Sequence, residues 1–226
     1  MGKEKCPCWL DVGNAARPAY NTDEERYPES SPMPARKPAP FYTLHVVLQE
    51  TDPPIWRRIV IDGNRSLGDL HYVLQTALGW TNAHLHNFVF PNAFYSDPSF
   101  DLEEIDRPVK DENKATVASV LKKRGSKCLY EYDFGDSWEH LITVEKVEPP
   151  AAIPIQWAMV TDGARACPPE DVGGTWGYKE MLETLRKKPA SMEAQEYRDW
   201  LSGIFDPEQF DMEEINSLLQ DIVAPG

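Results

Sequence analysis

The chain is poor in cysteine and has no long apolar run. Its 226 residues include four cysteines, and the N-terminus lacks the apolar stretch of a secretory signal. No run approaches the roughly 18 apolar residues that a membrane helix needs. Without a signal, so few cysteines in a chain of this length indicate free thiols rather than a disulfide framework. These absences predict a cytoplasmic protein without a membrane span.

Positive charge is also scarce. The formal net charge is −14, and from Ser126 onward 20 acidic residues stand against 8 basic ones. An acidic surface repels phosphate backbones, so the composition disfavours direct nucleic-acid binding. It suits a basic protein or peptide partner, or bound cations.

Familiar catalytic motifs are missing. There is no G-x-S-x-G, no H-E-x-x-H and no C-x-x-C. Ser137 has no expected oxyanion-hole donors, so a hydrolase triad lacks support. Cys6 and Cys8 resemble half of a zinc knuckle, but no second cysteine pair accompanies them. The sequence therefore contains no recognisable complete catalytic set.

The distribution of proline distinguishes an N-terminal arm from a folded domain. Residues 1–40 carry seven prolines and predict an extended N-terminal arm. Apolar periodicity begins at Phe41, so we expect one domain over residues 41–226. Within it, residues 41–148 form a core of sheet and helix, and residues 149–226 form a loop and a helical tail. An apolar share of 41% is sufficient for a packed interior.

The core has the pattern of an α+β domain. Ser66 and Asp69 form a capping box and Gly79 is a stop signal, so a helix is expected between them. Residues 91–113 are acidic and interrupted by proline, which predicts a surface loop. A short helix is expected over residues 116–123. Period-two alternation predicts five strands, over residues 41–49, 55–61, 84–90, 128–134 and 138–147.

This order predicts a mixed β-sheet crossed by one helix, similar to a β-grasp in its ββαβ-ββ order. Three further short helices are expected over residues 178–187, 192–201 and 212–222. We expect this C-terminal group to cover an exposed face or edge of the sheet.

The hairpin at residues 130–140 (YEYDFGDSWEH) concentrates polar groups around one turn. A three-residue loop would pair Phe134 with Trp138 and place Asp133 opposite Glu139, away from an aromatic core face. A two-residue loop would flip the second strand; we prefer the first register because it buries Ile142 with the aromatic residues. Under a purely structural interpretation, Asp136 only forms the turn and His140 is a satisfied core histidine.

Two other segments carry candidate metal ligands. His84 and His86 form an H-x-H pair that a strand would place on one face. The segment 167–174 (CPPEDVGG) offers Cys167, Glu170 and Asp171, soft and hard donors before a helix. The alternatives are an aromatic stripe for the histidines and a rigid connector for the loop. The candidate site is His84, His86, Asp133, Asp136, Trp138, His140, Cys167, Glu170 and Asp171. Its metal ligands would be His84, His86, Asp136 and Cys167, for Zn²⁺ or Mn²⁺.

Five segments together resemble the Ri-plasmid open-reading-frame-three-like proteins: 53–58 (PPIWRR), 79–88 (GWTNAHLHNF), 130–140, 167–174 and 203–211 (GIFDPEQFD). The likeness runs in the same order over about residues 41–219. It implies a compact α+β domain in an uncharacterised family, whose occasional transposase or resolvase labels rest on gene context. Residues 94–113 are not part of the family signature.

Two functional hypotheses follow from different classes. One is a non-enzymatic module that binds a protein or peptide, linked to mobile genetic elements through the family. The other is a divalent-metal protein or metal-dependent hydrolase, in which an Asp or Glu acts as general base on metal-bound water. The first requires an exposed apolar patch, and the second requires the three polar segments to meet.

Overall fold

The computed structural model describes residues 39–100, 108–150 and 157–221. The expected N-terminal arm, with Cys6 and Cys8, lies outside them. The elements are, in chain order, β1 (Phe41–Leu48), β2 (Trp56–Asp62), α1 (Leu67–Leu78), β3 (His86–Phe90), β4 (Ala93–Ser96), β5 (Val109–Asp111), η1 (Glu112–Lys114), α2 (Val117–Val120), β6 (Lys127–Tyr132), β7 (Trp138–Glu148), β8 (Ala158–Ala164), α3 (Gly174–Lys187), α4 (Met192–Trp200) and α5 (Met212–Asp221).

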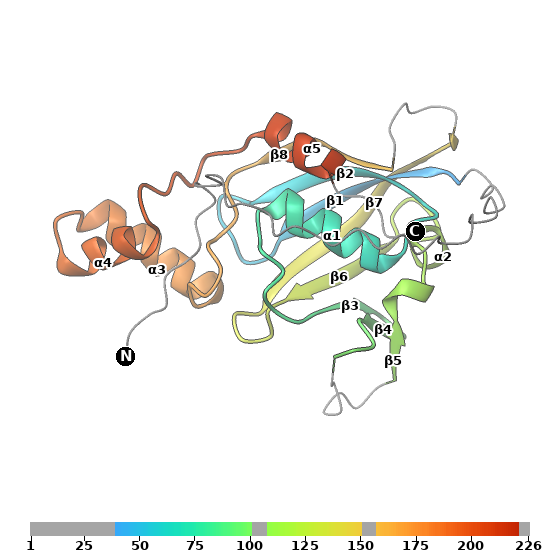
Figure 1. The fold of residues 1–226 in the computed structure, drawn as a ribbon, viewed down its shortest axis with the longest axis horizontal. Coiled ribbons are helices and arrows are strands. Elements are labelled where there is room, and N and C mark those ends of the chain that lie inside the picture. Colours follow the sequence, from blue (N-terminus) through green and yellow to red (C-terminus); the bar gives the residue numbers. More distant parts are fainter. Residues whose placement is uncertain (1–38, 101–107, 151–156, 222–226) are drawn as a thin grey trace, which may run out of the picture.

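The described strands form one mixed sheet in the order β5-β4-β3-β6-β7-β1-β2-β8. Every neighbouring pair is antiparallel except β4 and β5. The expected α+β class and mixed sheet are therefore confirmed, but the predicted strand order is incomplete. Figure 1 shows α1 across one face of the sheet, with α5 beside it.

Local signals set the first elements. Tyr42, Leu44, Val46 and Leu48 alternate along β1 and are buried in the core. Ser66 and Asp69 exchange both hydrogen bonds of the capping box, which places the start of α1. Gly79 ends the helix with φ of 78°, a conformation that glycine adopts without a Cβ penalty.

The part predicted as a surface loop contributes the sheet edge. β4 pairs with β3, and β5 adds a parallel strand beyond it. Pro91 and the acidic residues suggested a loop, but Phe94 and Tyr95 pair with β3 across a tight turn. The Pro-rich connection also contains β8, which pairs with β2. β8 pairs with a strand far away in the sequence, whereas β4 pairs with the strand just before it and was missed because its surroundings have the composition of a loop.

The hairpin register differs from the preferred one by two residues. Tyr132 pairs with Trp138 and Tyr130 with His140, so the loop has five residues rather than three. A shift of two keeps every side chain on its expected face, and all four of these residues are fully buried. Phe134 is exposed instead of paired, and Glu131 takes the place opposite Glu139 that was expected for Asp133.

The C-terminal helices do not act as one cover. α5 packs on β8 and α1, whereas α3 and α4 pack on each other, and Figure 1 places this pair beyond one end of the sheet. Asp211 caps α5 by accepting a hydrogen bond from the Glu214 N–H at 2.9 Å. Among the described residues, no helix combines the length and apolar character required to cross a membrane.

Candidate functional site

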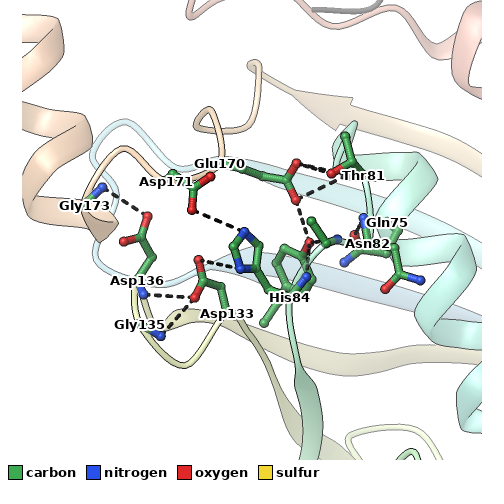
Figure 2. Close-up of polar contacts among 12 residues, drawn as sticks. Gln75, Thr81, Asn82, His84, Asp133, Gly135, Asp136, Glu170, Asp171 and Gly173 are labelled. Atoms are coloured by element: carbon green, nitrogen blue, oxygen red, sulfur yellow. Dashed lines mark hydrogen bonds and ion pairs between the residues drawn. The ribbon is translucent and has the colours of Figure 1, made fainter. Parts of the chain in front are cut away.

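His84 lies at the meeting point of three loops. Its Nδ1 is 3.7 Å from Asp133 Oδ2, in the β6–β7 turn. Its Nε2 is 3.3 Å from Asp171 Oδ1, in the loop before α3. Figure 2 shows the imidazole between the two carboxylates. Nε2 is buried and has no hydrogen-bond partner among the described residues, although the Asp171 carboxylate lies beside it.

The conformation of Asp133 explains both its position and the longer turn. Asp133 has φ of 59°, in the left-handed region that Asp and Asn adopt more easily than most residues. Its Oδ1 accepts hydrogen bonds from the Gly135 and Asp136 N–H groups, at 2.9 and 3.3 Å. These bonds form an Asx turn and leave Oδ2 directed toward His84, as Figure 2 shows.

Glu170 anchors the second loop. It is buried, and it accepts hydrogen bonds from the Thr81 hydroxyl and the Tyr132 hydroxyl, each at 2.6 Å. The indole N–H of Trp80 donates to the Pro168 carbonyl at 3.0 Å. The loop is thereby fixed to the segment that carries His84. Glu170 is thus a positioning residue rather than an open ligand.

Asp171 extends from this anchored loop toward solvent. Its side chain is 70% exposed, and its backbone has φ of 61°. Desolvation beside the cluster raises the pKa of Asp171; the neighbouring charge of His84 opposes this, and nearby carboxylates add to it. The carboxyl therefore releases its proton at a higher pH than an ordinary Asp.

Asp136 ties the hairpin to α3. Its Oδ2 accepts a hydrogen bond from the Gly173 N–H at 3.1 Å (Figure 2). A Cβ on Gly174 would come within 2.6 Å of the Asp136 carbonyl oxygen, and Gly174 has φ of 67°. Glycine is therefore required where the two loops meet.

His86 belongs to a different environment from His84. Because β3 begins at His86, His84 lies outside the strand, and the expected single H-x-H face does not form. His86 Nε2 is 2.9 Å from Glu112 Oε2, with both side chains buried. Its ring stacks on His71 with centroids 3.5 Å apart. Burial and then the charge of His86 lower the pKa of His71 to about 3.

The remaining predicted residues lie in the core. Trp138 and His140 are fully buried in β7, and burial lowers the pKa of His140 to about 4. The Cys167 thiol is buried 3.7 Å from the Arg57 guanidinium, and burial raises its pKa. Among the described residues, His84, Asp133 and Asp171 form the single group of three or more His, Cys, Asp or Glu with ligand atoms within 4.8 Å of one another. His86, Asp136 and Cys167 are outside this group.

Sequence reasoning did not identify the residues that connect these loops. The Tyr132 hydroxyl, besides donating to Glu170, accepts a hydrogen bond from the Ala83 N–H at 3.0 Å. Asn82 links the loop that carries His84 to helix α1. Its N–H donates to the Gln75 side chain, and its Oδ1 lies 2.7 Å from His71 Nε2. In the sequence, these contacts are indicated only by Tyr132, a core tyrosine directly before the polar turn of the hairpin.

The arrangement is suited to a cation. One imidazole nitrogen and two carboxylate oxygens from three fixed loops are donors that Zn²⁺ and Mn²⁺ accept. Three protein donors leave further coordination positions for water or a ligand. The left-handed residues Asn82, Asp133, Ser137 and Asp171 all lie in these loops, and such backbone conformations concentrate at functional sites.

Comparison with known proteins identifies relatives over most of the chain. Residues 40–214 match the model of the plasmid pRiA4b ORF-3-like protein family. The uncharacterized protein y4hQ of Sinorhizobium fredii is 37% identical over 183 residues, which cover 80% of this chain and 91% of that protein. A crystal structure of protein MM3350 of unknown function from Methanosarcina mazei Go1 matches with a TM-score of 0.69 and 34% identity, over 78% of this chain and 97% of that one.

Proposed function

We propose that this chain, which belongs to the plasmid pRiA4b ORF-3-like protein family, binds a divalent metal ion through His84, Asp133 and Asp171. The observation that carries the proposal is the convergence of one imidazole and two carboxylates from three separate loops. The backbone of each loop is restrained by hydrogen bonds that do not use the proposed ligand atoms. A site prepared in this way binds an ion with little reorganisation.

The donor set favours Zn²⁺ or Mn²⁺. Mg²⁺ and Ca²⁺ prefer sites made only of oxygen, whereas His84 supplies a nitrogen. No thiol takes part, because Cys167 is buried beside Arg57. Asp171 is the exposed ligand, so an ion would enter from its side and release protons as it binds.

A bound ion would act as a Lewis acid and lower the pKa of a coordinated water. Asp136 is the candidate base for that water, because Gly173 orients its carboxylate near the three ligands without placing it among them. Glu170 is unsuited to this role, since Thr81 and Tyr132 already occupy its oxygens. The proposed class is therefore metal-assisted hydrolysis.

Titration calorimetry of the full chain with ZnCl₂ and MnCl₂ tests the metal proposal. We expect one ion per chain, and at least about tenfold weaker binding for Asp171→Asn because a charged ligand is lost. Asp162→Asn, an equally charge-changing substitution of an exposed acid on β8, is the matched control and should bind as the unmodified chain does. Absence of saturable binding, or equal binding by both variants, rejects the proposal.

A second candidate function is recognition of a basic peptide over the same loops. Leu85 and Phe134 are exposed on two of the loops that form the metal cluster, and Trp176 is exposed in the first turn of α3, directly after the third loop. Large apolar side chains beside acidic groups suit a partner with alternating basic and apolar residues. The support for this function is independent of metal binding, since none of the three supplies a ligand.

The test is a titration of the chain with a fluorescently labelled decapeptide of alternating Arg and Leu. Fluorescence anisotropy measures binding, and a chelator is present throughout. Trp176→Ala and Phe134→Ala should weaken binding. Met192→Ala removes an exposed apolar side chain from α4 and serves as control. Peptide binding that is the same in all three variants contradicts recognition at these loops.

A further inference from the structure

The three loops that form the metal cluster are acidic and contain no basic side chain. Residues 79–86, 131–140 and 166–178 include six acidic residues and no lysine or arginine. Around His84, Figure 2 shows four of these carboxylates, those of Asp133, Asp136, Glu170 and Asp171. The charge of these loops therefore limits which molecules can reach a metal ion at His84.

Basic groups next to these loops are engaged elsewhere. Arg165, in front of the third loop, forms an ion pair with Glu208 at 2.7 Å. Lys179, directly after it, lines a separate cleft of about 790 Å³ that none of the metal-cluster residues lines. Helix N-termini bind anions, but the N-cap of α3, Gly173, already donates its N–H to the Asp136 carboxylate. None of these groups is thus free to hold an anionic substrate at the metal cluster.

The charge balance disfavours phosphate esters. Asp133 and Asp171 together balance the charge of one divalent ion, and Asp136 then leaves the site negative. Sites that hydrolyse or transfer phosphate groups surround the phosphoryl oxygens with Arg, Lys or further metal ions. Here a phosphate group would meet three carboxylates, whereas an uncharged carbonyl group meets no such repulsion.

Two glutamates behind the turn favour a positively charged molecule. Glu131 and Glu139 lie directly opposite each other on β6 and β7, where like charges destabilise a sheet. Glu131 accepts hydrogen bonds from the neutral side chains of Asn87 and Ser137, both at 3.2 Å. Residues 128–145 contain no lysine or arginine that could balance the pair. A cation that approaches the turn is therefore attracted by the pair and reduces the repulsion between the two carboxylates.

Exposed aromatic rings add a second preference for a cation. Phe134 directly follows the metal ligand Asp133, and Trp176 lies in the first turn of α3. The Asp136–Gly173 hydrogen bond ties these two segments together. The faces of Phe and Trp rings attract ammonium and guanidinium groups.

We propose that the substrate of this site is a carboxylic amide that carries a positive charge outside its reacting group. The inference rests on the proposed metal-assisted hydrolysis and names its substrate class. Water adds to the amide carbon and gives one proton to Asp136; the carbon–nitrogen bond then breaks, and the leaving nitrogen takes that proton. The carboxylic acid product ionises at neutral pH, and repulsion by the remaining carboxylates favours its release.

The test compares four chromogenic compounds as substrates of the zinc-loaded full chain. Aminocaproyl p-nitroanilide is cationic, heptanoyl p-nitroanilide is its neutral counterpart, and the mono-p-nitroanilide of adipic acid is anionic; p-nitrophenyl phosphate is the fourth. We expect kcat/KM to be at least about tenfold higher for the cationic anilide than for the neutral one, and lower again for the anionic one. We expect no hydrolysis of p-nitrophenyl phosphate.

Ionic strength checks that charge causes this order. Raising NaCl from about 0.02 M to about 0.5 M should reduce the advantage of the cationic anilide, because salt screens charges near the surface. The neutral anilide should react at the same rate at both concentrations. Both comparisons use the unmodified chain, so a folding defect cannot obscure them.

Two variants connect the activity with the loops. Asp136→Asn should lower kcat by at least about 100-fold, as loss of a general base does, while Zn²⁺ still binds. Glu139→Gln should reduce only the preference for the cationic anilide, by about threefold, the size of effect expected of an exposed charge. Glu183→Gln, on an exposed glutamate of α3 that pairs with Lys187, is the matched control and should keep both activity and preference.

Calorimetry with ZnCl₂ separates this inference from the metal proposal. If the chain does not bind Zn²⁺, the metal proposal fails and the substrate class fails with it. If Zn²⁺ binds but no anilide is hydrolysed, the substrate class is wrong although the metal proposal stands. The same holds if the neutral or anionic anilide reacts as fast as the cationic one, or if p-nitrophenyl phosphate is the better substrate.

Discussion

His84 and His86 are two residues apart, yet they occupy opposite kinds of environment. His84 lies in a loop, one quarter exposed, between carboxylates from two other loops. His86 begins a strand, is buried against Glu112, and stacks on His71. A histidine whose ring is already paired and stacked serves the core, whereas one that lies partly exposed between two carboxylates can accept a ligand.

The largest expected effect is the loss of stability on substitution of the buried His86. His86→Leu leaves Glu112 buried without its partner, so we expect the free energy of unfolding to fall by about 3–5 kcal/mol. Urea unfolding measures the loss. The double variant His86→Leu/Glu112→Leu should recover part of it, while His45→Leu, at a half-buried site on β1, should lose less. A small loss without rescue would mean that the pair contributes little to the core.

The contact between the hairpin and α3 comes next. Gly174→Ala combines left-handed strain with a Cβ 2.6 Å from the Asp136 carbonyl oxygen, so a loss of about 2–4 kcal/mol is expected. Gly79→Ala, at φ of 78° with no atom within 4 Å of its Cβ, carries only the strain and should lose about 1 kcal/mol. Thermal unfolding of both variants separates the two contributions. Equal losses would exclude a tight approach of the loops.

Substitution of the partly exposed His84 should change metal affinity rather than the free energy of unfolding. His84→Gln should reduce Zn²⁺ affinity by about 100-fold, the upper end of what is lost when even a supporting residue is removed. The stability of the metal-free chain should change by less than about 1 kcal/mol, because the ring forms no hydrogen bond through Nε2. Calorimetry and urea unfolding provide the two measurements. A large loss of metal-free stability would place His84 with His86 as a structural residue.

The last effect is a change of slope rather than a single loss, and it concerns pH and the buried histidines. Burial lowers the pKa of His140 to about 4, below the usual value near 6.5. The unfolded chain therefore takes up a proton that the folded chain does not, so stability is lost as pH falls from about 6.5 to about 4. His140→Phe should reduce the slope of unfolding free energy with pH by about 1.4 kcal/mol per unit in this range. An unchanged slope would show that His140 is protonated in the folded state.

The fold was predictable where the determining contacts are local. The alternation of β1 and the capping box at Ser66 depend on neighbours in sequence, and both occur as expected. β8 depends on a partner far along the chain, and β4 and β5 were missed because their polar, Pro-interrupted surroundings predicted a loop. Part of the family motifs lies in loops, at residues 79–85, 133–137 and 203–211, which strand and helix patterns do not describe.

The candidate site was predictable in its segments but not in its membership. His84, Asp133 and Asp171 were all among the nine expected site residues. The expected metal ligands, however, were His84, His86, Asp136 and Cys167, and of these only His84 lies in the described cluster. His86 was included because a strand from residue 84 would have aligned the two rings. β3 begins only at His86, after the left-handed residue Asn82, and the neighbouring strand β6 ends at the left-handed residue Asp133. Pairing of Asp133 with its own turn could not be read from alternation, because the side chain replaces a backbone hydrogen bond.

The most direct test of the central claim is an NMR experiment that observes the imidazole nitrogens of the five histidines as Zn²⁺ is added to the full chain. The account predicts that one equivalent of Zn²⁺ shifts the ring nitrogens of His84, while those of His86 and His71 keep their positions. A shift at His86, or no shift at His84 under saturating Zn²⁺, would contradict it.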